Sequence, residues 1–421
     1  MKRTSTLTFL LLLFGIAVQA QSLGSLTLRE SYNMARSNYP LIRQQGLIQS
    51  ASDFNVENIL KGNLPQVNLN AQASYQTEVT RLPIEVPGMD VPVLDKDQYQ
   101  VYAEINQKLF DGGKTEKKVK IQEAQQDIEE GQLEVQLYDI YKRVSQLYFG
   151  ILLAKEQILQ NDLQEKDIQL AMDRVQTRIQ NGAAIESDLF TLKASQLSIH
   201  QRTTELISLK KAYYQMLSIF VGKDVDEETM LTRPQETMDI GGINRLEVGL
   251  FDKQMSLLDL QSSLLNTKIT PSLSLFGRAG YGKPGLNMLS NEFDSYFLGG
   301  ARLQWPLFNL YTNKKEKEIN KIEKEKLQTQ KETFLFNTKM ELTQQHTEID
   351  KFRKLLEMDD SIIESYVKVK DASLFKLDNG TIDVNDYIRD VNQESRAIQN
   401  KLLHEIQLLM KLEELKITQG I

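Results

Sequence analysis

Two stretches near the start of the chain alternate between hydrophobic and polar side chains. Residues 67–76 read VNLNAQASYQ and residues 101–109 read VYAEINQKL, so apolar residues occupy nearly every second position. A period of two is typical of strands that have one apolar face. A weaker alternation follows Pro271 and returns near residue 299. The pattern predicts four strands, at 65–80, 97–110, 271–283 and 294–308.

The rest of the pattern is helical. From Leu137 to Ile158 apolar residues recur in alternating steps of three and four, and five of the seven matching positions between 335 and 356 are apolar. Such a seam indicates helices packed side by side at coiled-coil angles. None of the nine prolines lies between residues 93 and 233 or after 306. Because proline is the residue that most disrupts a helix, we expect long helical hairpins over 114–220 and 312–415.

An Asn-Gly pair interrupts each helical stretch, Asn181-Gly182 in the first and Asn379-Gly380 in the second. Glycine readily adopts the left-handed conformation that ends a helix, so we expect these pairs, at 181–182 and 379–380, to form the hairpin tips. Polar side chains just after the turns can cap the returning helices. The candidate caps are Ser187 or Asp188 in the first hairpin, and Asp383 or Asn385 in the second.

The chain is an internal duplication. The two Asn-Gly pairs are 198 residues apart (379 − 181), and Leu109-Phe110 recurs as Leu307-Phe308 at the same offset. Each copy therefore has a helix, two strands and a helical hairpin in the same order. The predicted organisation is a first repeat over 24–225, an equatorial linker over 226–242 and a second repeat over 243–421.

The first 20 residues predict the compartment. Lys2 and Arg3 precede a short apolar run that ends in Val18-Gln19-Ala20, the pattern of a secretory signal peptide over residues 1–20 with cleavage after Ala20. Removing two of the 50 basic residues and none of the 57 acidic ones changes the net charge from −7 to about −9. Such an acidic chain is a poor partner for nucleic acid. With no cysteine, it also has no disulfide, thiol chemistry or cysteine metal site.

The strands have two interpretations. No stretch after residue 20 is apolar enough for a transmembrane helix, so entry into a membrane would require β-strands. Aromatic residues gather at the strand ends, as in outer-membrane barrels. The alternative is an ordinary water-soluble antiparallel sheet, which alternates in the same way. Four strands are too few to close a barrel, since the smallest have about eight. A membrane barrel would therefore need strands from several chains.

A duplicated unit of two strands and a helical hairpin behind a signal peptide resembles the outer membrane efflux protein family, the TolC-like channels. The resemblance extends from about Leu26 to Leu415 and lies in the order and spacing of short motifs. These motifs are Asn38-Tyr39-Pro40, Leu64-Pro65, Thr270-Pro271, Leu109-Phe110-Asp111-Gly112-Gly113-Lys114, Leu307-Phe308 and the two Asn-Gly pairs.

The resemblance implies a fold that is mainly α with membrane β. Three chains would form a trimeric 12-stranded outer-membrane β-barrel, with four strands per chain, continuous with a long periplasmic α-helical barrel. It also implies a function as the outer-membrane exit duct of a tripartite efflux or secretion system. Its partners would be two further copies of the chain, a periplasmic adaptor protein, an inner-membrane transporter and outer-membrane lipid. The tip turns Asn181, Gly182, Asn379 and Gly380 would dock the adaptor.

The resemblance further implies a gate at the tips. In the family, a ring of aspartates closes the tunnel at the tips. The aspartate of this ring corresponds to Asp386 in the second repeat, and its counterpart in the first repeat is Asp188. A second ring aspartate is replaced by Arg389, next to Asp390, which predicts an Asp386–Arg389 link instead. Helix capping by these aspartates, Asp383 among them, is the alternative role.

The sequence gives little support for catalysis or for a cofactor. The three histidines, His200, His346 and His404, lie on separate helical stretches without ligand spacing, and no phosphate loop or nucleophile motif is present. We therefore expect no enzyme activity, no cofactor and no metal site. The alternative function is a periplasmic coiled-coil adaptor or structural envelope protein that forms no pore.

Overall fold

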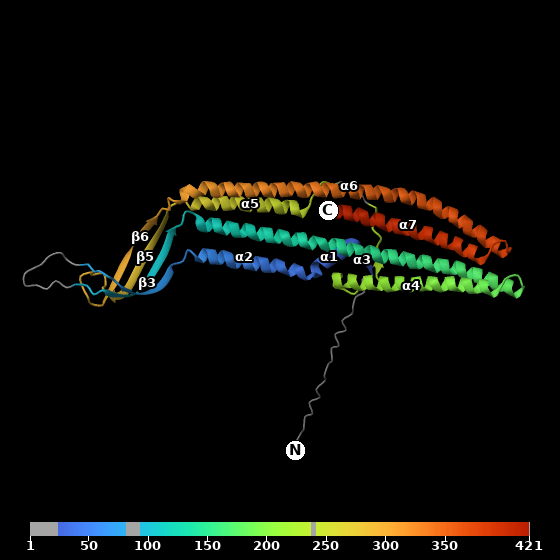
Figure 1. Cartoon of the computed structure of the whole chain (residues 1–421), viewed down its shortest axis with the longest axis horizontal. Coiled ribbons are helices and arrows are strands. Elements are labelled where there is room, and N and C mark those ends of the chain that lie inside the picture. Colours follow the sequence, from blue (N-terminus) through green and yellow to red (C-terminus); the bar gives the residue numbers. More distant parts are fainter. Residues whose placement is uncertain (1–23, 81–92, 237–240, 421) are drawn as a thin grey trace, which may run out of the picture.

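The computed structural model describes residues 24–80, 93–236 and 241–420. The predicted signal peptide lies outside the described residues. A small sheet occupies one end of the molecule, and helices run from it to the opposite end, where both helical hairpins turn (Figure 1). The elements in chain order are β1 Ser25–Leu26, α1 Leu28–Asn38, the 3-10 turn Pro40–Arg43, α2 Gln44–Lys61, β2 Gln66–Tyr75, β3 Asp97–Phe110, α3 Lys114–Gln180, α4 Glu186–Val221, β4 Met230–Leu231, α5 Leu246–Thr267, β5 Ser272–Lys283, β6 Asp294–Gln304, α6 Asn309–Asp378 and α7 Val384–Gln419.

The two long helices α3 and α6 contain 67 and 70 residues. At about 1.5 Å per residue, each extends roughly 100 Å. Two shorter helices follow one another along each long helix: α2 and α4 along α3, and α5 and α7 along α6 (Figure 1). The heptad seam explains this packing, since Val144 and Ile151 on α3 and Ile349 on α6 are fully buried. The predicted hairpins are therefore present in both repeats.

The four longer strands form one antiparallel sheet in the order β2-β3-β5-β6. Strands from the two repeats meet at the β3–β5 pair, where Ala103 lies opposite Ala279. Strand β2 ends at Tyr75, earlier than the predicted residue 80, and β6 ends at Gln304, before Pro306. Proline has no backbone N–H for the ladder, which explains why Trp305 and Leu307 follow the strand rather than continue it.

The linker and both described ends of the chain meet halfway along the helices. Strand β1 pairs in parallel with β4, so that Leu26 lies opposite Leu231. The buried Tyr148 hydroxyl of α3 donates to the carbonyl oxygens of Leu26 and Thr232, each at 2.7 Å. At the C-terminal end of the described chain, the Asn244 backbone N–H donates to the carbonyl of Gln419, the last residue of α7, at 2.6 Å. The first set of contacts ties the linker to the first repeat, and the last one joins the two ends of the second repeat at mid-length.

Candidate functional site: the helical tips and the sheet

One face of the sheet presents apolar side chains to solvent. The cross-strand register places Leu69 opposite Ala103, and Ala279 opposite Phe297, on this face. Leu69 is 78% exposed, Phe297 72% and Leu303 71%. A contiguous apolar surface of this kind marks a face that lipid or another protein covers.

The opposite face of the sheet is polar. Arg278 of β5 donates to the carboxylate of Glu104 on β3 at 2.7 Å, and its guanidinium lies 4.2 Å from the centre of the Tyr102 ring. Asn106 also donates to Glu104, at 2.9 Å. A sheet with one exposed apolar face and one charged face matches the strands of a membrane barrel with a polar interior.

The two edge strands of this sheet, β2 and β6, each pair on one side within the described chain. Their outer backbone groups thus have no strand partner in a single protomer. Lipid cannot satisfy such groups, so an apolar sheet in a membrane requires another strand at each edge.

At the far end, both hairpins turn with the same backbone geometry. Gly182 has φ +70° and Gly380 has φ +69°. In each turn the glycine N–H and the following N–H bond back to the end of the helix: Ala183 N–H donates to the Arg178 carbonyl, and Thr381 N–H to the Lys376 carbonyl. This is the Schellman arrangement, in which glycine removes the cost of a left-handed residue. Both Asn-Gly pairs are therefore the tips, as the sequence predicted.

The two returning helices begin differently. In the second repeat, Asp383 precedes α7 and its carboxylate accepts the Asp386 N–H at 2.8 Å. In the first repeat, α4 begins at Glu186 and the capping position is Ile185, whose side chain has no oxygen. The expectation that Ser187 or Asp188 caps α4 is wrong, because both already lie inside its first turn. Asn385 is likewise inside the first turn of α7, which leaves Asp383 as the cap.

The acidic residues proposed for the gate have different environments. Asp386 forms an ion pair with Arg389 at 2.9 Å on the exposed side of α7. Asp390 is buried: it accepts from the Ser373 hydroxyl of α6 and from Arg389 Nε at 3.3 Å. Asp390 and then Asp386 raise the pKa of Arg389. Asp188 is half-buried, and within the described part of the chain its carboxylate has no ion pair.

Polar links that the sequence did not predict join the two hairpins near the tips. Lys370 of α6 contacts Asp167 of α3 at 2.9 Å and Glu394 of α7 at 2.8 Å. Burial lowers the pKa of Lys370, but its bonds to Glu394 and Asp167 outweigh burial and raise it. The ammonium group therefore stays charged and holds three helices together.

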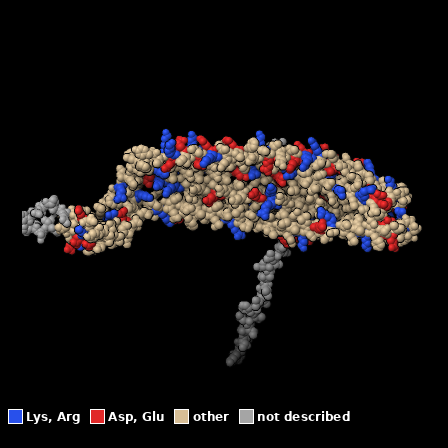
Figure 2. All heavy atoms as spheres, in the orientation of Figure 1, with Lys and Arg blue, Asp and Glu red and all other residues tan. Residues whose placement is uncertain are grey.

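A second set of links lies closer to the turns. Arg174 of α3 forms an ion pair with Asp378, the last residue of α6. Arg178, one turn further along α3, donates to the Leu377 carbonyl and, at 3.0 Å, to the Ala183 carbonyl. Arg178 thus ties the end of one hairpin to the turn of the other. Acidic and basic side chains lie together over this end of the molecule (Figure 2).

An apolar core lies beneath these links. Val175 of α3, Leu192 of α4 and Tyr387 of α7 are almost completely buried in one cluster that joins both hairpins. The tips are therefore packed against each other within one protomer, and their relative movement would have to disrupt both apolar and ionic contacts.

None of the helices in the described part of the chain is long and apolar enough to cross a membrane. Across the same residues, no group of three or more His, Asp or Glu side chains is arranged to hold a metal ion.

The family comparison and the comparison with solved structures agree with each other. Residues 31–217 match the family described as outer membrane efflux protein. No curated protein matches the sequence. Among solved structures, the outer-membrane channel OprN aligns over 93% of this chain and 89% of its own, with a TM-score of 0.69 and 13% identity.

Two further structures show the same similarity. The Campylobacter jejuni CmeC outer membrane channel covers 93% of this chain and 85% of its own, with a TM-score of 0.65 and 14% identity. The open state of the Neisseria gonorrhoeae MtrE outer membrane channel covers 93% and 88%, with a TM-score of 0.66 and 13% identity. At these identities the similarity establishes the fold. The family match covers residues 31–217, within the first repeat, and the structural similarity extends the same fold over both repeats.

Proposed function

We propose that three copies of this chain form the outer-membrane exit duct of a tripartite efflux or secretion system. The sheet carries the proposal: one face is apolar and exposed, the other holds the Glu104–Arg278 pair, and neither edge has a further strand among the described residues. Four strands per chain make twelve in a trimer, and a twelve-stranded cylinder leaves no edge in lipid. The polar face then lines the interior, and the helices continue the duct into the periplasm.

The duct works passively. An inner-membrane transporter supplies the energy, and a periplasmic adaptor joins that transporter to the helical tips. The tip turns, Asn181-Gly182 and Asn379-Gly380, are exposed and accessible for docking. Next to the first turn, Ile185 is 65% exposed and offers an apolar contact to an adaptor. The chain works in the outer membrane, after export with cleavage behind Ala20.

The tips act as the gate of this duct. In this proposal the Lys370 and Arg174 links hold each protomer's hairpins together, and adaptor docking weakens them. Asp386 and Asp188 face the aperture, where three copies of each aspartate attract cations and repel one another. The Asp386–Arg389 pair offsets part of this repulsion.

Reconstitution of the purified full chain into planar lipid bilayers tests the duct. Discrete single-channel conductance steps are expected, because a closed barrel with a polar interior carries ions. A protein that fractionates with the soluble periplasm and produces no conductance steps would refute the proposal.

A further inference from the structure

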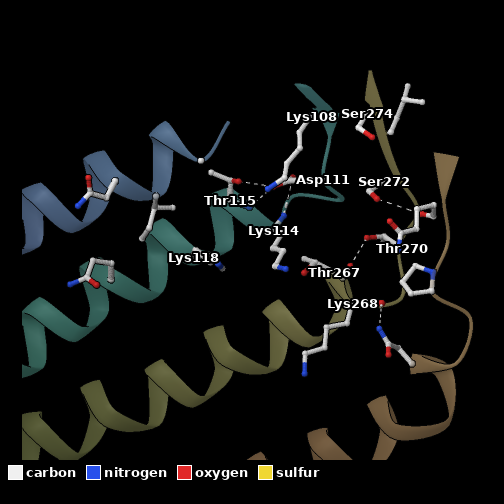
Figure 3. Close-up of a pocket in the computed structure, with 18 of the residues that line it drawn as sticks. Lys108, Asp111, Lys114, Thr115, Lys118, Thr267, Lys268, Thr270, Ser272 and Ser274 are labelled. Atoms are coloured by element: carbon white, nitrogen blue, oxygen red, sulfur yellow. Dashed lines mark hydrogen bonds between the residues drawn. The ribbon is translucent and has the colours of Figure 1, made fainter. Parts of the chain in front are cut away.

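A hollow of about 790 Å³ lies where the sheet joins the helices, far from the tips. It is framed by the end of α2, the junction between β3 and α3, and the junction between α5 and β5 (Figure 3). Both repeats therefore contribute to it. We call this hollow the junction site.

Lysines dominate the charge of the junction site. Its lining includes Lys108, Lys114, Lys118 and Lys268, against one carboxylate, that of Asp111. Lys268 forms an ion pair with Glu316 at 2.8 Å. The other three lysines make no ion pair within the described part of the chain. Lys and Arg side chains are also prominent on the surface at this end of the helical body (Figure 2).

The one carboxylate of the junction site, that of Asp111, already accepts hydrogen bonds from the protein itself. Asp111 accepts the backbone N–H groups of Gly113 at 2.9 Å and Thr115 at 2.8 Å, and the Thr115 hydroxyl at 2.6 Å. Burial alone would raise the pKa of Asp111, but these hydrogen bonds outweigh it and lower the pKa. The carboxylate therefore caps the start of α3 and forms no ion pair with the lysines of the junction site among the described residues.

The junction site also lies on the polar face of the sheet. Lys108 of β3 is opposite Ser274 of β5, two residues from Asn106 and four from Glu104 on the same face of the strand. Ser272 and Ser274 alternate with Leu273 in the same way, so their hydroxyls share that face. Hydroxyls beside unpaired ammonium groups provide donors for a group with several acceptor oxygens.

We propose that the junction site binds the phosphate group of an anionic ligand. Phosphate carries up to two charges near neutral pH and can accept hydrogen bonds from several ammonium and hydroxyl donors at once. The volume exceeds that of a lone phosphate, so the ligand has room for an organic part. Two sources share this chemistry: an anionic solute inside the duct, or the headgroup of a lipid at the edge of the barrel.

If the proposed duct is correct, three junction sites encircle its interior just below the barrel. A ring of three such sites would concentrate anions before they enter the barrel. The site itself is built within one chain, so its binding can be measured whether or not the trimer conducts.

The test is binding of inorganic phosphate to the purified full chain in neutral detergent, measured by calorimetry at low ionic strength. Saturable binding is expected for the wild type. The double variant Lys114→Gln/Lys118→Gln removes two unpaired charges and is expected to weaken binding roughly tenfold. The matched control, Lys117→Gln/Lys120→Gln, removes two charges from the same helix outside the lining and is expected to bind like the wild type.

Phosphate binding measured in lipid nanodiscs distinguishes a soluble anion from a lipid headgroup as the source of the phosphate group. If phosphate binds equally in phosphatidylglycerol and phosphatidylcholine discs, the ligand is a soluble anion. If phosphatidylglycerol alone abolishes phosphate binding to the wild type, a lipid headgroup occupies the site, which equally supports the proposal. Absence of saturable phosphate binding in detergent, or equal loss in the lining and control variants, would overturn it.

Discussion

The Lys370 link provides a quantitative test of the gate. Lys370 bridges Asp167 and Glu394, and the exposed fractions of the three side chains are 16%, 33% and 9%. Removing the ammonium leaves two carboxylates close together with no cation between them. Exposed ion pairs contribute about 0–1 kcal/mol, and breaking a buried pair costs about 3–5 kcal/mol. Because this network is half-buried, we expect Lys370→Met to cost about 2 kcal/mol.

That cost corresponds to a change of roughly 30-fold in the equilibrium between joined and separated hairpins of one protomer, since about 1.4 kcal/mol is a factor of ten. We therefore expect Lys370→Met channels to spend a much larger fraction of time in the conducting state. The measurement is the open fraction of single channels in planar bilayers, without adaptor.

Two variants serve as controls. Lys370→Arg keeps the charge and is expected to conduct like the wild type or slightly more. Lys368→Met removes a lysine two residues away whose pair with Glu364 is on an exposed helix face, with exposed fractions of 73% and 70%. It is expected to change nothing. If Lys370→Met and Lys368→Met have the same open fraction as the wild type, the links between hairpins do not restrain the tips.

Three further predictions concern the tips. Because the pKa of Lys370 is raised from 10.5, its stabilisation of the tips is full below about pH 10.5 and is lost as the pH rises through the folded value, so the open fraction of wild-type channels should rise in strong alkali while that of Lys370→Arg channels should not change. Asp383→Ala should cost about 1 kcal/mol of stability and speed amide hydrogen exchange in the first turn of α7. Ile185→Asp should slow exchange in the first turn of α4, because it supplies the missing cap. Equal exchange in the wild type and both variants would contradict the capping assignment. Gly182→Ala and Gly380→Ala should each cost about 1–2 kcal/mol in thermal unfolding because of their positive φ. The larger loss is expected in Gly380→Ala, whose Cβ would lie 2.8 Å from the Arg178 side chain. Equal losses would show that Arg178 moves aside without cost.

The sequence predicted those features that repeat or follow a regular period. The alternation around Leu69 and Val101 placed these residues on one face of the sheet, and the register confirms it. The seam around Val144 predicted the buried stripe of α3. The side-chain period of a single helix or strand determines which face each of these residues occupies. The buried face could therefore be predicted without knowing which other elements pack against it.

The links between hairpins could not be predicted in this way. Asp167 and Glu394 are 227 residues apart in the chain and come together through the packing of both repeats. Charged residues occupy most turns of these helices, and nothing in the pattern separates Lys370, which is half-buried between three helices, from Lys368, which faces solvent. The one local link that was predicted, Asp386–Arg389, has a spacing of three within a single helix.

The capping error has the same origin. Ser187 and Asp188 are good capping residues by type, but the position of a cap depends on where the preceding turn releases the chain. After Gly182, the segment before α4 is short enough to place Ile185 at the start of the helix. Local preference and the geometry of the turn disagree here, and the turn determines the boundary.

The proposed duct requires that strands of neighbouring chains close the edges of β2 and β6. The most direct test is the mass of the full-length protein purified in detergent, measured by native mass spectrometry. We expect a particle of three chains that dissociates only on heating. A stable particle of one chain, with β2 and β6 exposed or covered by its own helices, would refute the proposed trimer.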